Sequence, residues 1–206
     1  MNTHFTDEQK DALKEIMTIG AGNAATALSQ MLRKRVSIEI PKVNLASIDK
    51  APAIFGGEEA LVTTVYLQLY GDASGVILFS FHKNEANKLA DLLLDNPTGK
   101  TKILNDMGKS AIQETASILS GAYLSALSKL LNMKLLVSTP AIAHDMSGAI
   151  VDNILIETSK EADYTLIIDT ELYIVEEKVM AYFFFIPDVE SLRKILNTLG
   201  MEGNSN

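Results

Sequence analysis

Apolar residues near the start of the chain recur at the spacing of a helix. They are Leu13, Ile16, Ile19, Leu28 and Leu32. Positions three or four residues apart lie on one face of a helix, so this pattern predicts one long helix. Thr6, followed three positions later by Gln9, has the form of a capping box, which predicts that the helix begins near Thr6.

Runs rich in β-branched and aromatic residues follow this helix and predict strands. They cover residues 36–41, 61–70 and 75–81. The sequence Gly-Asp-Ala-Ser at 71–74 lies between the last two runs and predicts a turn, so these two strands should pair. Residues 82–96 return to a helical pattern, which Pro97 ends.

The second half of the chain shows the same order of patterns. It predicts a helix from about Asp106 to Asn132, a strand at 134–140, a β-prone stretch around Ala149–Glu157, paired strands at 163–175 and 178–187, and a closing helix at 188–200 that ends at Gly200. The chain therefore presents one series of elements twice.

The two series also align residue by residue. Moving the first half by 99 positions places Glu15 on Glu114 and Pro41 on Pro140. We interpret this as an internal duplication, with one domain over residues 1–206 made of two repeats, about 6–97 and 106–200. The predicted fold class is α+β with pseudo-two-fold symmetry, in which a largely antiparallel sheet carries the two long helices packed together on one face.

Each long helix carries a row of polar and small residues. At about 100° per residue, one row, the first stripe, consists of Asp11, Glu15, Thr18 and Gly22, and the matching row, the second stripe, consists of Ser110, Glu114, Ser117 and Gly121. A glycine within a helix costs about 1 kcal/mol relative to alanine. Its presence in both stripes indicates either that another surface approaches there or that Gly20, Gly22 and Gly121 allow the helices to pack tightly.

The composition excludes several kinds of site. The chain has no cysteine, which rules out thiol catalysis, disulfides and thiolate metal sites. His4, His82 and His144 are far apart in sequence, so no metal site is expected. The Thr-Gly-Lys-Thr sequence at 98–101 resembles the end of a phosphate-binding loop, but it lacks the earlier glycine and follows a helix. No cofactor is therefore expected.

Charge and hydropathy narrow the range of partners. The formal net charge is −8, so nucleic acid is not an expected partner. The longest apolar run, residues 180–187, is far shorter than the ~20 residues that a membrane helix needs, so no membrane insertion is expected. The first residues lack the pattern of a signal peptide, and with the lack of cysteine this predicts a cytoplasmic location.

The two stripes together resemble the motif of the CheC-like chemotaxis family, which includes CheC, CheX and FliY. That motif has Asp or Ser, three residues, Glu, two residues, Asn, and then Pro 23 positions further on. Asp11, Glu15 and Pro41 match it in the first half, and Ser110, Glu114 and Pro140 match it in the second. The segments IGAGNAATALS, AHDMSGAI and FFFIPDVESLRKIL are also similar to CheC, so the resemblance covers almost the whole chain.

The resemblance implies that the chain hydrolyses the aspartyl phosphate of a phosphorylated CheY-type response regulator. In the family the Glu pairs with a lysine of the regulator, a role that falls here on Glu15 and Glu114, while the Asn orients the attacking water. Thr18 and Ser117 stand at the position of that Asn. A hydroxyl is shorter than the amide by about 1.5 Å and tends to bond back to the carbonyl one turn earlier. The sequence therefore predicts slow turnover.

A further contact is implied by the resemblance to CheC itself. There, the region after the second motif Pro contacts the receptor deamidase CheD, and the matching segment here is 143–148, with Asp145 as the candidate contact. A polar turn or a helix cap is the alternative interpretation of Asp145. The alternative function for the whole chain is a non-enzymatic adaptor that binds CheD, a receiver or the flagellar switch.

Overall fold

The computed structural model of the chain describes residues 7–157 and 164–198. The predicted capping box at Thr6, the first histidine, His4, and the predicted helix end at Gly200 lie outside these residues. Within them, the long helices and the strands of each predicted pair are found close to their expected positions.

Apart from one short 3₁₀ helix in the first half, the described residues of both halves contain the same order of helices and strands. The first half gives α1 (Asp7–Leu32), β1 (Val36–Glu39), β2 (Val43–Ser47), the 3₁₀ helix η1 (Ile48–Lys50), α2 (Ala51–Ile54), β3 (Leu61–Gly71), β4 (Gly75–His82) and α3 (Lys83–Leu93). The second gives α4 (Asp106–Leu131), β5 (Leu135–Val137), β6 (Ala141–Met146), α5 (Ser147–Glu157), β7 (Tyr164–Ile174), β8 (Glu177–Pro187) and α6 (Val189–Thr198). The origin of this order by duplication, and the division into two repeats, stay predictions.

One eight-stranded sheet takes strands from both halves. Its order is β1-β7-β8-β4-β3-β5, with β2 also paired to β7 and β6 also paired to β3. All of these pairs are antiparallel, which confirms the predicted sheet type. The outer strands are exchanged between the halves: β1 and β2 join β7, while β5 and β6 join β3.

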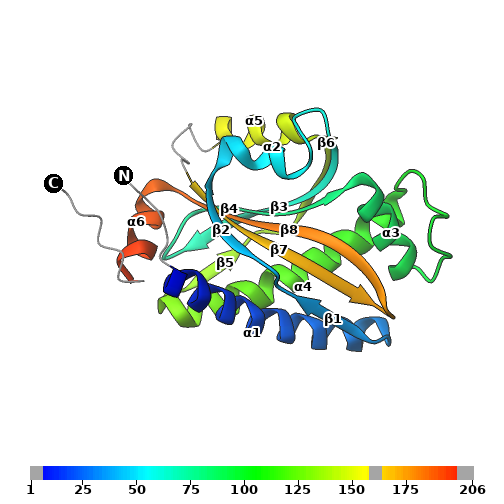
Figure 1. Cartoon of the computed structure of the whole chain (residues 1–206), viewed down its shortest axis with the longest axis horizontal. Helices are drawn as coiled ribbons and strands as arrows, with labels where there is room; N and C mark the ends of the chain where they lie inside the picture. Colours follow the sequence, from blue (N-terminus) through cyan, green and yellow to red (C-terminus); the bar gives the residue numbers. More distant parts are fainter. Residues whose placement is uncertain (1–6, 158–163, 199–206) are drawn as a thin grey trace.

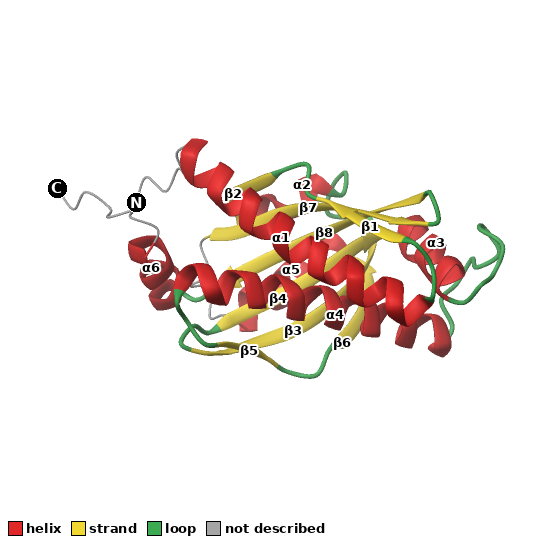
Figure 2. Cartoon of the chain, turned by 90° about the horizontal axis from the view of Figure 1, so that it is seen from below, coloured by secondary structure: helices red, strands yellow, loops and turns green. Residues whose placement is uncertain are grey.

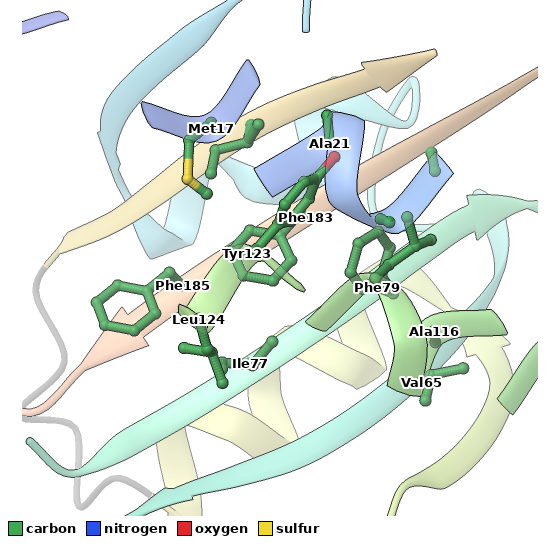
Figure 3. Packing of buried hydrophobic residues seen from close by; sticks show 14 of the residues in the cluster. Met17, Ala21, Val65, Ile77, Phe79, Ala116, Tyr123, Leu124, Phe183 and Phe185 are labelled. Carbon is green, nitrogen blue, oxygen red and sulfur yellow. The ribbon is translucent and has the colours of Figure 1, made fainter. Parts of the chain in front are cut away.

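Helices cover both faces of the sheet. The long helices α1 and α4 lie side by side on one face, as predicted, and α2 and α5 lie on the other (Figures 1 and 2). The larger core lies under α1 and α4, where the ring centroids of Tyr123 and Phe183 are 5.1 Å apart and Phe79 lies 5.1 Å from Phe183 (Figure 3). This packing fixes which sides of α1 and α4 remain exposed.

The predicted β-prone stretch around Ala149–Glu157 is wrong, because these residues belong to helix α5. Ile150, Val151, Ile154 and Leu155 pack in the smaller core against the sheet. Their spacing places all four on one side of a helix, but so short an apolar run does not distinguish a buried helix from a buried strand by sequence alone. The sequence analysis also missed α2, β2 and β6.

A buried aspartate holds the connection between the two halves. The Asp91 carboxylate accepts the backbone N–H of Gly99 at 2.9 Å and the Thr101 hydroxyl at 2.6 Å. Burial works to raise the pKa of Asp91, but these hydrogen bonds outweigh it and hold the pKa below its usual value. Their stabilisation is therefore present above the pKa of an unfolded aspartate, about 3.9, and is lost as the pH falls through the lowered folded value. The Thr-Gly-Lys-Thr segment is thus anchored by its own chain.

Candidate functional site

Both stripes lie on the side of their helices that faces away from the sheet. Leu13, Met17 and Leu28 bury the opposite side of α1 in the larger core. Glu15 and Glu114 are exposed, and the other first positions of the stripes, Asp11 and Ser110, are exposed as well. The structure therefore leaves both glutamates accessible to a partner, as the proposed docking role requires.

The two hydroxyl residues of the stripes are bonded to their own helices. The Thr18 hydroxyl donates to the backbone carbonyl of Lys14 at 2.7 Å, and the Ser117 hydroxyl donates to that of Gln113 at 2.9 Å. Both bonds run one turn back along the helix, as the sequence predicted for hydroxyl residues at these positions. Each hydroxyl proton is thus committed to the backbone and does not point outward.

The motif prolines are attached to the helices by side chains that the sequence analysis did not single out. The Lys14 ammonium donates to the carbonyl of Pro41 at 3.1 Å, and the Gln113 amide donates to the carbonyl of Pro140 at 3.1 Å. Lys14 and Gln113 occupy aligned positions directly before the motif glutamates. This alignment is the sequence feature that could have identified them as candidate site residues. Each candidate site therefore consists of a stripe and the proline segment beside it.

The glycines of the stripes are not explained by helix packing. A Cβ atom added to Gly22 or to Gly121 would meet nothing within 4 Å, whereas one added to Gly20 would lie 3.0 Å from Cδ1 of Tyr123 and 3.2 Å from the carbonyl oxygen of Ala122. The packing interpretation therefore holds for Gly20 and is wrong for the other two. The approach of another surface to Gly22 and Gly121 stays a prediction.

The same substitution at two positions of α1 should have opposite effects on stability. Gly20→Ala forces a shift against α4 and should lower the free energy of unfolding by about 1–3 kcal/mol. Gly22→Ala meets no neighbour and should raise it by about 0.5–1 kcal/mol. Urea unfolding of the two variants beside the wild type measures both changes. A loss of stability in Gly22→Ala would show that its position is not open.

Ile19 differs from the other apolar residues of the first helix. The helical pattern includes it, but its side chain is 53% exposed and lies next to Thr18 on the outer surface of α1. An isolated exposed apolar residue is common on protein surfaces, so its position alone identifies no site. It adds an apolar contact beside the first stripe.

Asp145 lies on a different element from the stripes. It belongs to strand β6, where it is exposed and its carboxylate accepts the backbone N–H of Met146 at 2.8 Å. The interpretation of Asp145 as a turn or helix cap is wrong, because the residue lies within a strand. Its suggested contact with CheD is untested by this geometry.

The two described histidines, His82 and His144, contact other side chains of the chain. His82 packs against the ring of Phe55 at 5.2 Å, and His144 Nδ1 lies 2.9 Å from the Thr63 hydroxyl. Among residues 7–157 and 164–198, no group of three or more His, Cys, Asp or Glu side chains is placed to hold a metal ion. In the same residues, no helix is both long and apolar enough to cross a membrane.

Known proteins match the segments of the chain that contain both stripes. The model of the CheC-like family matches residues 8–45 and 107–144, and each range contains one stripe and its proline. The CheY-P phosphatase CheC of Bacillus subtilis (strain 168) is 32% identical over 198 residues, which cover 94% of this chain and 95% of that protein. The chain belongs to the CheC-like family. The resemblance inferred from the motifs is thereby confirmed.

Other members of the family share part of the sequence or the fold. The flagellar motor switch phosphatase FliY of Bacillus subtilis (strain 168) is 27% identical over 139 residues, which cover 67% of this chain and 36% of that protein. The crystal structure of Thermotoga maritima FliY superimposes with a TM-score of 0.74 at 20% identity, covering 98% of this chain and all of that one. At this identity the structural match supports the fold alone, and it confirms the predicted combination of helices with an antiparallel sheet.

Proposed function

We propose that this chain binds a phosphorylated CheY-type response regulator through the first and second stripes and slowly hydrolyses its aspartyl phosphate. The observation that carries the proposal is an exposed motif glutamate on each long helix, Glu15 and Glu114, beside a helix-bound motif proline. The Bacillus subtilis relative at 32% identity is a CheY-P phosphatase. In this proposal each glutamate pairs with a lysine on the active surface of the receiver.

The contact surface extends along the stripes. Asp11 and Ser110 are exposed one turn before the glutamates, and Gly22 and Gly121 are exposed two turns after them. A side chain at Gly22 or Gly121 would collide with nothing in this chain, so packing within the chain does not require glycine there. The lack of a side chain leaves room for the backbone of a receiver to approach closely. The approach of a partner is a physical reason for a helix-destabilising residue at both positions.

The reaction in this proposal is the hydrolysis of an acyl phosphate. Water adds to the phosphorus atom, the bond to the aspartyl oxygen breaks with its electron pair leaving on the carboxylate, and inorganic phosphate and a proton are released. The part of the protein is to dock the receiver and to place the water. Thr18 and Ser117 replace the asparagine that does this in the family, and both hydroxyls are already bonded to backbone carbonyls. This geometry supports the proposal of slow turnover.

The test is phosphate release from each CheY-type receiver of the same cell, phosphorylated with a small-molecule phosphate donor, with and without the chain. The expected result is a modest acceleration with at least one receiver. Binding measured in parallel by calorimetry separates docking from hydrolysis. Absence of both binding and acceleration with every receiver would reject the proposal.

An adaptor without phosphatase activity is the second candidate, and the edge strand β6 favours it. Within the described part of the chain β6 pairs only with β3, and Asp145 and Met146 are exposed on it, the latter by 49%. A free strand edge with exposed side chains suits a protein partner. In this proposal Asp145 contacts CheD. Retained receiver binding without acceleration of phosphate release, together with loss of CheD binding in Asp145→Ala, would support the adaptor.

A further inference from the structure

We propose that Lys14 binds the phosphoryl group of the docked receiver, so that the first stripe discriminates between phosphorylated and unphosphorylated receivers more strongly than the second. This inference rests on the proposed function and assigns a residue that the family motif does not contain. It follows from a difference in charge at two aligned positions that make the same contact, Lys14 in the first site and Gln113 in the second.

The position of Lys14 places its ammonium inside the first candidate site. Its backbone carbonyl accepts the Thr18 hydroxyl, and its side chain reaches the carbonyl of Pro41. Lys14 therefore contacts both motif positions of the first site: its backbone carbonyl contacts Thr18, which stands at the place of the family asparagine, and its ammonium contacts Pro41. A phosphoryl group positioned for hydrolysis would lie next to the same two positions.

The ammonium is available to an anion. Lys14 is exposed, and its hydrogen bond to Pro41 uses one of three N–H donors. No ion pair with a carboxylate involves it within residues 7–157 and 164–198. A second lysine, Lys42, follows Pro41, but its charge acts on the Asp169 carboxyl. Burial raises the pKa of Asp169, and the charge of Lys42 offsets part of that increase. Lys14 is thus a cation of the first site that forms no ion pair within the described residues.

The second site carries no charge at the same place. Gln113 makes the equivalent hydrogen bond to Pro140 over the same distance, 3.1 Å, and its carbonyl accepts the equivalent hydroxyl. Holding the motif proline therefore requires only a hydrogen-bond donor that reaches its carbonyl, and a charge is not needed. The positive charge of Lys14 is surplus to that task, and a flexible ammonium is a common ligand of phosphate in proteins.

Two reciprocal substitutions test the inference. The measurement is the dissociation constant for a CheY-type receiver, with and without beryllofluoride as the stand-in for its phosphoryl group. Lys14→Gln should keep the fold, since Gln113 shows that glutamine makes the same contact, and it should lower the preference for the beryllofluoride form by about fivefold. Gln113→Lys should raise that preference by a similar factor.

The controls separate this role from a structural one and from the proposed function. Lys129→Gln removes an equal charge from the last turn of α4 and should leave the preference unchanged. The wild-type preference should shrink toward that of Lys14→Gln in about 1 M salt, where the screening length is about 3 Å. A wild type that binds neither receiver form would reject the proposed function itself. A wild type that prefers the beryllofluoride form, with the same preference in Lys14→Gln and Gln113→Lys, would reject only the role of Lys14.

Discussion

Replacing Thr18 and Ser117 together by asparagine should accelerate phosphate release from a phosphorylated CheY-type receiver by on the order of tenfold to a hundredfold, the range expected when a group misplaced by about 1 Å is restored. The present hydroxyls donate to the carbonyls of Lys14 and Gln113 and are shorter than an amide. Asparagine reaches further from the helix and presents a donor and an acceptor together. The rate of phosphate release at saturating receiver measures the change.

Another hydroxyl residue of α1, Thr26, supplies the control. Thr26 also bonds one turn back, to the carbonyl of Gly22 at 3.0 Å, but lies two turns beyond Thr18. Thr26→Asn should therefore leave the rate unchanged. The single variants Thr18→Asn and Ser117→Asn show which site contributes more. A fast wild type that both changes slow down would contradict this interpretation of the hydroxyls.

Removing both motif glutamates should have the largest effect on binding. Glu15→Gln and Glu114→Gln keep the size of each side chain but remove the charge that pairs with a receiver lysine. Losing one partner of a charge pair buried on docking costs about 2–5 kcal/mol, so receiver affinity at each site should fall at least about thirtyfold. Either single variant should retain binding at the other stripe.

The fold should survive these changes because both side chains are exposed. Thermal unfolding verifies this, and the matched control is Glu58→Gln with Glu59→Gln, which alters two exposed glutamates in the segment before β3. Titration calorimetry with the receiver then gives both stoichiometry and affinity. Unchanged affinity in the double variant Glu15→Gln, Glu114→Gln would remove the stripes as the docking surface.

The sequence predicted the elements whose patterns are long, and it placed the residues of each candidate stripe together because they lie on one helix. The strands at 61–70 and 75–81 and the long helices are found close to their predicted bounds, because a period sustained over many residues is hard to mistake. The same period placed Glu15 and Glu114 on the polar stripes, and the structure shows that both are exposed. The short run at Ala149–Glu157 was misassigned because too few turns were available to establish its period.

Contacts between distant segments were out of reach of pattern analysis. The bond from Lys14 to Pro41 joins residues 27 positions apart, and so does the bond from Gln113 to Pro140. Their equivalence could be seen only once both were placed in space. The tight position at Gly20 is a similar case, since the sequence showed three glycines and only the packing of α4 distinguishes one from the others.

The exchange of outer strands between the halves makes the stability of one candidate site depend on the other half of the chain. A chain severed between its halves would leave β3 without β5 and β6, and β7 without β1 and β2. Each fragment would expose an unpaired backbone edge, a template for aggregation. The two sites therefore share one unfolding equilibrium, and a substitution that loosens the scaffold in either half lowers the active fraction of both.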